Sequence, residues 1–233
     1  MCGRFTITVS NDELRDYLKH DYDIDLDERL FDVPRYNVAP GQDVIAIIND
    51  GQKNRVGLLR WGFLPSFAQD EKIAYTMINA KSETLTEKPA YQEAFKSKRC
   101  IILADGFYEW KKDKSDKKPL YILHKDKSIF PMAGLWSTWT KENGTKVHTC
   151  TIITTEANQL MEPFHDRMPV ILEAESKKLW LNPFEKNTNT LSKILKPYDS
   201  NLMTYYPVST LVNAAKNDSK ACIMEDKTMS QLV

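Results

Sequence analysis

The chain has 233 residues, 42% of them hydrophobic, and can therefore bury a sizeable core, most simply as one domain spanning 1–233. Lysine and arginine together number 32, as do aspartate and glutamate, so the formal net charge is zero and excludes a general electrostatic attraction for nucleic acid. The sequence has neither a secretory signal pattern nor an apolar stretch long enough to cross a membrane, so we expect a cytoplasmic protein without a membrane partner.

The first half of the chain carries clear local signals for helices and strands. Ser10, followed three residues later by Glu13, is typical of a capping box at the start of an amphipathic helix. Turn residues and apolar patterning predict further elements, namely a hairpin of strands 44–49 and 55–63 around Asp50-Gly51, a strand over 73–80, and a helix opening at Pro89.

Strand signals dominate the second half. Apolar runs rich in β-formers predict strands over 100–110, 119–125, 130–139 and 147–155, with a charged turn at 111–118 between the first two. After them come a predicted helix at 156–164, a strand at 168–173, short helices at 175–182 and 190–198, and a last strand at 202–209. Many strands, helices at the edges and little alternation of the two predict an α+β fold built on a mostly antiparallel, barrel-like sheet.

The cysteine and histidine patterns argue against several kinds of chemistry. The four cysteines are far apart and lack CxxC spacing, which is not the pattern of a disulfide framework or a zinc knuckle. The four histidines show no metal-ligand spacing, and the glycine motifs that bind phosphates and dinucleotides are missing. We therefore expect no metal and no cofactor.

Cys2 is the first candidate for chemistry, because removal of Met1 would make it the N-terminal residue. Its free α-amine would have a pKa of about 7.7 to 8.0 beside a thiol of pKa about 8.5, so both groups would be partly nucleophilic near neutrality. The amine can condense with an aldehyde to an imine, and the thiol can close onto the imine carbon as a five-membered thiazolidine. The alternative is that Cys2 is only a packing residue at the start of a buried strand.

Three other segments contain polar side chains suited to catalysis or binding. On a strand, Glu109 is flanked by large aromatics, and burial would raise its pKa toward neutrality; the alternative is an edge carboxylate paired with a lysine. His165 precedes an apolar strand and could relay protons, and Arg167 could bind a phosphate through two hydrogen bonds. The alternative is structural: Asp166 caps the turn, and Arg167 pairs with it. Asn79 could orient a carbonyl group, and Lys81 could neutralise a phosphate. The alternative is that this segment is only a strand that leads into the N-cap of a helix at Ser82 or Thr84.

Seven motifs occur in order along the chain: MCGRF at the start, RYNVAPGQ from Arg35, RWGFLP from Arg60, NAKSET from Asn79, GFYEW from Gly106, HDRMPVIL from His165 and VSTLVNAAKND from Val208. Together they resemble the SOS response-associated peptidase family, also called SRAP domains, whose members process abasic sites. The resemblance implies the α+β fold predicted above. It also implies a protein that removes its own Met1 and joins Cys2 to the ring-opened abasic sugar in single-stranded DNA as a thiazolidine, which shields the lesion. A lyase-like activity is a further expectation.

By the same resemblance, the catalytic set at the N-terminus comprises Cys2, Asn79, Glu109 and His165. Asn79 would position Cys2, Glu109 would manage protons at the amine and during loss of Met1, and His165 would help to open the sugar ring and to reverse the crosslink. The expected DNA-binding residues are Arg4, Asn37, Pro40, Trp61, Phe67, Lys81 and Arg167. We expect a monomer, bacterial or phage-encoded, that is located at the nucleoid when bound to DNA.

Two positions depart from the family pattern. The family commonly has arginine where this chain has Lys81, so the charge is kept but bidentate geometry is lost. A second tryptophan of the family is replaced by Phe67, which can still stack or wedge against a base.

Two other functions are open at this point. Glutaminases with an N-terminal nucleophile also begin with Cys-Gly after processing, and their α-amine acts as base for its own thiol. A non-catalytic reader of single-stranded nucleic acid would stack bases on the aromatics of RWGF and GFYEW while Cys2 only packs. Release of ammonia from glutamine tests the first alternative, and the Cys2→Ala variant tests the second.

Overall fold

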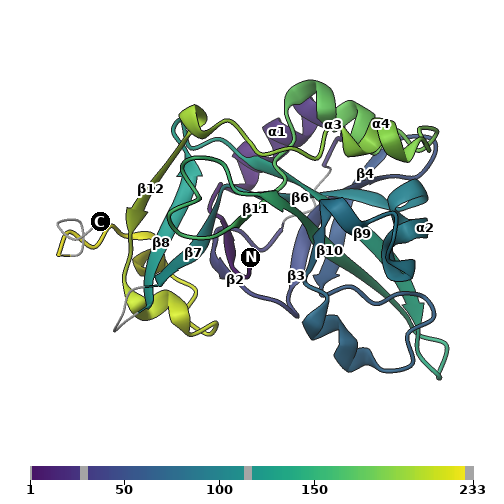
Figure 1. Cartoon of the computed structure of the whole chain (residues 1–233), viewed down its shortest axis with the longest axis horizontal. Coiled ribbons are helices and arrows are strands. Elements are labelled where there is room, and N and C mark those ends of the chain that lie inside the picture. The colour runs from purple at the N-terminus through teal and green to yellow at the C-terminus, as the bar shows by residue number, and fades with distance from the viewer. Residues whose placement is uncertain (1, 27–30, 113–116, 229–233) are drawn as a thin grey trace.

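The computed structural model describes residues 2–26, 31–112 and 117–228, in which two β-sheets stand side by side with helices packed around them (Figure 1). The first sheet has the strand order β12-β8-β7-β1-β2, and all of these pairings are antiparallel. Its strands are β1 (Phe5–Ile7), β2 (Arg35–Val38), β7 (Gly106–Lys112), β8 (Lys117–His124) and β12 (Met203–Pro207). The N-terminal arm therefore enters the sheet between two other strands.

The second sheet closes into a five-stranded barrel, because strand β9 pairs back with β10 at the end of the order β10-β4-β3-β6-β9. The barrel strands are β3 (Asp43–Asn49), β4 (Asn54–Trp61), β6 (Arg99–Ala104), β9 (Phe130–Thr140) and β10 (Lys146–Glu156). Two short strands, β5 (Asn79–Lys81) and β11 (Arg167–Pro169), also pair with β10. Parallel pairing is confined to β10–β4 and β10–β5 in the described residues. The predicted α+β fold with a mostly antiparallel, barrel-like sheet is confirmed.

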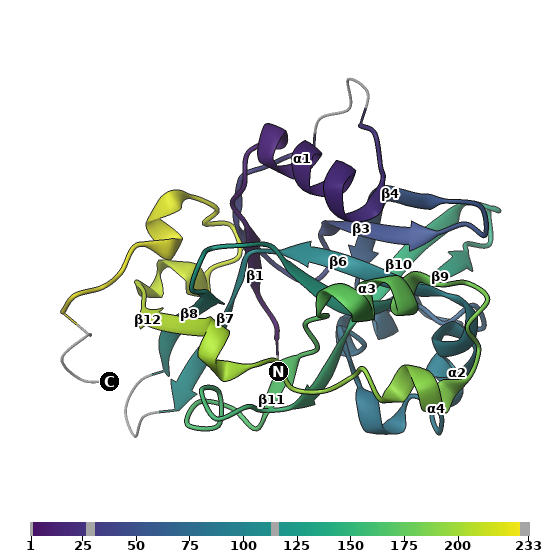
Figure 2. The same ribbon diagram turned by 90° about the horizontal axis from the view of Figure 1, so that it is seen from above.

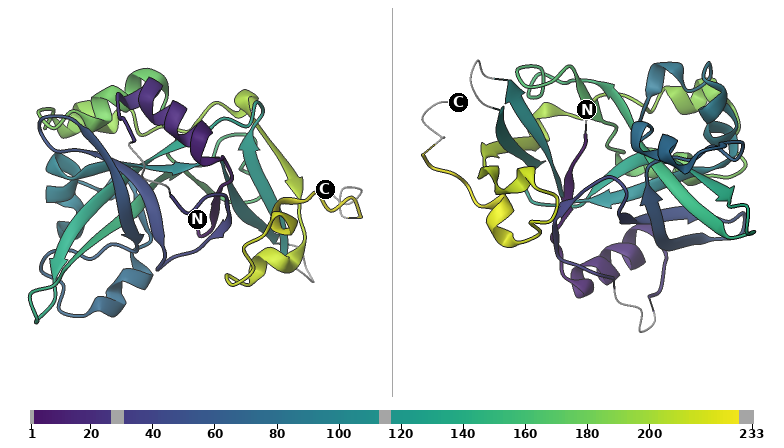
Figure 3. Two further views of the ribbon diagram at one scale, coloured as in Figure 1. Left: turned by 180° about the vertical axis from the view of Figure 1, so that it is seen from behind. Right: turned by 90° about the horizontal axis from the view of Figure 1, so that it is seen from below.

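Short helices cover the barrel and its flank (Figures 2 and 3). The α-helices are α1 (Asn11–Tyr22), α2 (Pro89–Ser97), α3 (Ala174–Leu181) and α4 (Thr188–Ser192). The 3-10 helices are η1 (Glu71–Thr76), η2 (Ser82–Thr84), η3 (Ser200–Leu202), η4 (Thr210–Asn213) and η5 (Lys220–Ile223). The capping box is confirmed, because Ser10 and Glu13 each accept the backbone N–H of the other. In the described part of the chain, we find no helix that is long and apolar enough to span a membrane.

Alternating residues of the barrel strands face two different cores. On β3, Ile45 and Ile47 pack into a core shared with the helices, whereas Val44 packs into a second core with Phe107 of the open sheet. Strand β6 is buried along its whole length, as expected for a strand covered on both faces. Cys2 belongs to the second core, so the two sheets meet at the start of the chain.

A buried aspartate divides the strand predicted over 100–110 between the two sheets. Asp105 accepts hydrogen bonds from the Thr6 hydroxyl and from both the N–H and the hydroxyl of Thr8, which satisfies its carboxylate where the chain crosses from β6 to β7. The next position, Gly106, requires a glycine, because a Cβ atom there would lie 2.4 Å from the ring of Tyr121. The crossing places strand β7 beside the N-terminal arm.

Most other predicted elements are confirmed with small shifts at their ends, including the hairpin, whose Gly51 has a φ of 95°. The strand predicted over 73–80 is wrong for most of its length. Helix η1 occupies its first part because the Asp70 side chain accepts the Lys72 N–H and caps the turn. Part of the charged turn predicted at 111–118 lies outside the described residues.

The helix predicted over 156–164 is also wrong. The Asn158 side chain accepts the N–H of Met161 and nucleates a series of turns at 159–164 instead. Pro163 cannot donate a helical hydrogen bond, so a helix there would lose part of its bonding. These turns lead directly into His165.

Candidate active site

The N-terminal arm runs into the junction between the two sheets (Figure 2), where Cys2 shares a core with Met168 of β11. Phe5 of β1 lies opposite Phe107 of β7. Continued by two residues, this antiparallel register places Gly3 beside Glu109, so the carboxyl group is delivered next to Cys2.

Cys2 is fully buried, and its backbone is held by Asn79 of strand β5. The side-chain amide of Asn79 donates a hydrogen bond of 2.9 Å to the carbonyl oxygen of Cys2. The amide oxygen of Asn79 is buried and has no hydrogen-bond partner among the described residues. A buried acceptor without a partner is costly, so this oxygen is suited to receive a donor from an N-terminal amine or a ligand. The contact fits the positioning role expected of Asn79.

Glu109 is a buried carboxyl group, only 4% exposed, and it interacts electrostatically with both Cys2 and His165. Burial raises the pKa of Glu109 above its ordinary value, while nearby positive charge, including that of His165, opposes the rise. Burial also raises the pKa of the Cys2 thiol to about 12, and the charge of Glu109 adds to that rise. These three groups therefore act on one another's charge states around Cys2.

His165 lies in the turn before β11, and the two residues that follow it fix its ring. The Arg167 N–H donates to Nδ1 of His165 at 3.0 Å, and a carboxylate oxygen of Asp166 lies 2.8 Å from the same nitrogen. Nδ1 therefore has one donor, the Arg167 N–H, and one acceptor, the Asp166 carboxylate, within hydrogen-bond distance. In the protonated ring Asp166 stabilises the positive charge. The ring can therefore both donate and take up a proton.

Strand β10 explains how distant segments of the chain come together. Its Thr154 is paired with Lys81 of β5 on one side and with Pro169 of β11 on the other. The segments that contain Asn79 and His165 are thus carried by the two immediate neighbours of one strand.

Two residues expected to contact DNA hold the arm against residues 212–217, which we name the C-terminal clamp (Figure 3). Arg4 Nη1 donates to Asn37 Oδ1 at 2.8 Å and to the Val212 carbonyl oxygen at 2.7 Å. The Asn37 amide donates to three carbonyl oxygens within the clamp. Because Asn37 is fully buried, it does not line a DNA groove in this structure.

The apolar residues expected to shape a groove differ in exposure. Trp61 is buried, packs against Phe5 with ring centroids 5.1 Å apart, and donates its indole N–H to the Ile78 carbonyl oxygen. It belongs to the core and cannot stack on a base in this conformation. Phe67 is 67% exposed in the loop after β4, and Pro40 is partly buried after β2, so both can contact a ligand.

Lys81 and Arg167 flank β10, but their environments differ. Lys81 is exposed, whereas the Arg167 side chain is only 12% exposed. The guanidinium of Arg167 forms a paired contact with both carboxylate oxygens of Glu83, each at 2.9 Å. Glu83 lies two residues after Lys81 in the NAKSET motif and was not among the residues predicted to bind DNA.

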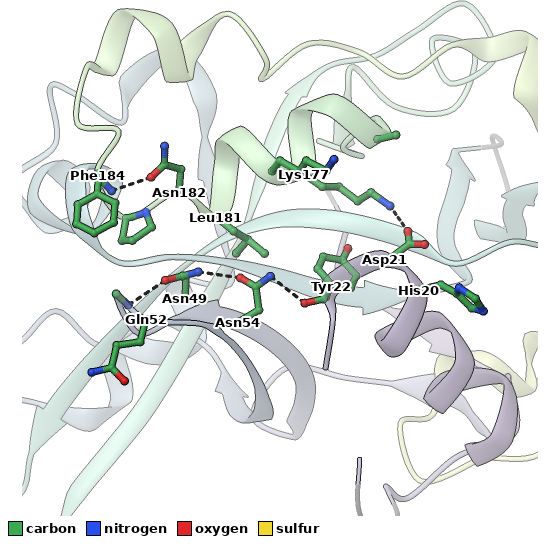
Figure 4. A pocket seen from close by; sticks show the side chains of 14 residues that line it. His20, Asp21, Tyr22, Asn49, Gln52, Asn54, Lys177, Leu181, Asn182 and Phe184 are labelled. Carbon is green, nitrogen blue, oxygen red and sulfur yellow. Dashed lines mark hydrogen bonds and ion pairs between the residues drawn. The ribbon is translucent and has the colours of Figure 1, made fainter. Parts of the chain in front are cut away.

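Two surface cavities lie outside this cluster. One, of about 450 Å³, is bordered by the end of α1, the β3–β4 hairpin and α3 (Figure 4). Much of its polar lining is already satisfied, since Asn49 bonds to Asn54 and Lys177 pairs with Asp21. The other, of about 890 Å³, lies along β1 to β4 and mixes three aspartates with two arginines, which does not favour a polyanion. Across the described residues, no group of three or more potential metal ligands lies together.

Replacing Glu109 with glutamine should remove a cost to stability that depends on pH. Because burial raises the pKa of Glu109 in the folded state, the native protein binds this proton more tightly than the unfolded chain does. The stability that the wild type gains from the protonated carboxyl group is fully present below the pKa of the unfolded chain. It is lost as the pH rises through the pKa of the folded state. Urea denaturation should show the unfolding free energy of Glu109→Gln, relative to wild type, increasing as the pH rises above about 4, where the carboxyl group of the unfolded chain ionises. A difference that does not change with pH would contradict a raised pKa.

Comparison with known proteins gives a consistent result over nearly the whole chain. Residues 1–215 match the family model described as SOS response associated peptidase (SRAP). The abasic site processing protein YoqW of Bacillus subtilis (strain 168) is 49% identical over 224 residues, covering 96% of this chain and 99% of YoqW. The abasic site processing protein HMCES of Xenopus tropicalis is 32% identical, covering 96% of this chain and 78% of that protein.

Solved structures share the fold. A crystal structure of a protein from Bacteroides thetaiotaomicron has a TM-score of 0.82 at 26% identity, covering 97% of this chain and 100% of the other. A phage-related protein of Bordetella bronchiseptica has a TM-score of 0.70 at 27% identity, covering 90% of this chain and 95% of the other. The family expected from the seven motifs is thereby confirmed, and the chain belongs to the SOS response associated peptidase (SRAP) family.

Proposed function

We propose that the protein detects abasic sites in single-stranded DNA, as a monomer, and bonds to them covalently through Cys2. The observation that carries this proposal is the grouping of the buried Cys2 with Asn79, Glu109 and His165. The relatives named abasic site processing proteins support the same lesion as the target. When bound, the protein is located with the DNA, at the bacterial nucleoid.

The bond-forming sequence follows from the chemistry of an N-terminal cysteine. Once Met1 is removed, the neutral α-amine of Cys2 adds to the aldehyde carbon of the ring-opened abasic sugar, and the carbinolamine loses water to give an imine. The sulfur then bonds to the imine carbon, and the thiol proton ends on the nitrogen. The product is a thiazolidine, and the by-product is one molecule of water. Because the aldehyde is consumed, the lesion is shielded from strand cleavage.

Glu109 is suited to move the protons in this sequence. Burial raises its pKa, which favours the protonated carboxyl group that can donate to the departing hydroxyl of the carbinolamine. The resulting carboxylate can then accept the proton of the Cys2 thiol. The thiol needs such a base because a pKa of about 12 keeps it protonated at neutral pH.

Asn79 and His165 act beside this proton carrier. Asn79 holds the Cys2 carbonyl, and its amide oxygen is available to accept a hydrogen bond from the new amine. His165 exchanges protons with the sugar during ring opening and during reversal of the crosslink, since an imidazole can both donate and accept a proton.

We assign removal of Met1 to the same site. Hydrolysis of the peptide bond before Cys2 consumes one water molecule and releases free methionine. Glu109, as a carboxylate beside Cys2, is suited to deprotonate that water. The cleavage turns an amide nitrogen into the α-amine that later attacks the aldehyde, so one site prepares its own nucleophile.

A local patch holds the DNA strand. Arg4, Lys81 and Arg167 supply positive charge for phosphates, and Pro40 and Phe67 supply apolar contacts for bases. Because the net charge of the chain is zero, binding depends on these few contacts and weakens as salt is added.

Intact mass spectrometry tests the proposal directly. The purified protein should lack Met1, and after mixing with abasic single-stranded DNA its mass should increase by that of the oligonucleotide minus one water. An undamaged oligonucleotide of the same sequence should give no shift, and incubation with glutamine should release no ammonia. An unshifted mass with the abasic strand would contradict the proposal.

A further inference from the structure

Arg167 has almost no donor left for a phosphate in this structure. A guanidinium has five N–H donors. Two of them bond to the carboxylate oxygens of Glu83, and Nη2 also donates to the Thr154 carbonyl oxygen at 2.6 Å. The Nε atom is buried and has no partner in the described residues. One Nη1 donor remains, on a side chain that is only 12% exposed.

The Glu83 carboxylate has the geometry that a phosphate would adopt on Arg167. Carboxylates and phosphates both accept two parallel N–H bonds from the guanidinium fork. Arg167 is anchored by the Thr154 bond, whereas the Glu83 side chain is 51% exposed and can turn into solvent. Of the two partners, the carboxylate is therefore the one that can leave.

We propose that Glu83 occupies the phosphate position on Arg167 and is exchanged for a backbone phosphate when DNA binds. The inference rests on the proposed function, which assigns Arg167 to a phosphate, and it adds a residue that sets the affinity for the strand. Each encounter with DNA must first break the Glu83 contact, so part of the Arg167–phosphate attraction is offset. Lys81, which is exposed two residues earlier, stays available for the first encounter.

The backbone N–H of Arg167 gives this exchange a link to the reaction centre. It donates to Nδ1 of His165 at 3.0 Å, so the residue that takes up the phosphate also contacts the proton carrier. The Thr154 bond keeps Arg167 in place while the partner of its guanidinium changes. The exchange can therefore alter affinity without displacing the His165 ring.

The Glu83→Gln variant tests the proposal, because it keeps the size of the side chain but removes the charge. The probe is a single-stranded oligonucleotide with a tetrahydrofuran abasic analogue, which has no aldehyde and reports only reversible binding. We expect Glu83→Gln to bind this probe about fivefold more tightly than wild type, the scale of one partly exposed ion pair. Glu87→Gln is the matched control, since it removes an exposed carboxylate from the same segment, and it should change the affinity by less than about twofold.

Repeating both substitutions in an Arg167→Gln background separates competition from general repulsion. If Glu83 competes for Arg167, the gain from Glu83→Gln disappears in that background. Weaker or unchanged binding by Glu83→Gln, a gain no larger than that of Glu87→Gln, or a gain that persists without Arg167 would each overturn the proposal. Thermal unfolding of each variant checks that the fold is retained.

The proposed function is measured separately. Adduct formation with an aldehyde-containing strand reports on Cys2 alone, by mass. If wild type and Glu83→Gln both fail to bind the tetrahydrofuran probe, the exchange is overturned, while an adduct that requires Cys2 would leave the covalent function standing.

Discussion

The Cys2→Ala variant should form no adduct that survives denaturation with abasic single-stranded DNA. Alanine after Met1 still supplies an N-terminal amine once Met1 is removed, so an imine can form, but no sulfur is present to close the ring. An imine hydrolyses when the complex is unfolded, whereas a thiazolidine persists. Denaturing gel electrophoresis and intact mass should therefore show complete loss of the covalent product.

Reversible binding is the control for this result. Cys2 is fully buried and contributes no charge, so affinity for the tetrahydrofuran probe should change by less than about twofold. Borohydride should trap the imine of the Ala variant as a reduced amine, which would separate loss of ring closure from loss of the amine. A full yield of stable adduct without reduction would show that another group forms the covalent bond and that Cys2 is only a packing residue.

Once Met1 has been removed, as intact mass verifies, the Glu109→Gln variant should form the adduct about 100-fold more slowly than wild type. This is the usual scale for loss of one general acid–base group. Glutamine has nearly the same shape but neither donates nor accepts a proton at neutral pH. The expected loss is in the rate at saturating DNA, with affinity for the tetrahydrofuran probe retained. Quenched time courses on denaturing gels would measure it.

A second measurement distinguishes proton transfer from a purely structural role of Glu109. The wild-type rate should vary with pH through the titration of the buried carboxyl, and the Gln variant should lose that part of the profile. Glu162→Gln, which removes an exposed carboxylate from the turns before His165, is the matched control and should leave both rate and profile unchanged. Equal slowing at every pH, with the wild-type profile kept, would count against Glu109 as the proton carrier.

Local signals in the sequence predicted the elements that depend on a few neighbouring residues. The Ser10 and Glu13 box starts α1, Pro89 starts α2, and Asp50-Gly51 forms the turn of the β3–β4 hairpin. Each of these depends on backbone conformation and hydrogen bonds within about four residues, so a single chain suffices to identify them.

Long-range contacts were not predictable in the same way. The break at Asp105 depends on Thr6 and Thr8, which lie about a hundred positions earlier in the chain. The burial of Trp61 depends on Phe5, and nothing local distinguishes a core tryptophan from one that stacks on a base.

The candidate site was predicted in part. The resemblance of the motifs to a family predicted that Cys2, Asn79, Glu109 and His165 form one site. Taken singly, each residue could equally have had a structural role. The Glu83 contact was missed because its significance depends on a partner 84 positions away, across β10. A charged residue inside a motif is a signal for such a partner, but only the structure identifies it.

The C-terminal clamp has a consequence for when the protein becomes reactive. Arg4 and the Val212 carbonyl oxygen that holds it are 208 positions apart, so the two cannot meet until nearly the whole chain has been synthesised. Until then Arg4 lacks this anchor, although β1 can already pair with β2 and β7. The last contact that fixes the N-terminal arm therefore forms only when synthesis is nearly complete, so Cys2 reaches its final position late.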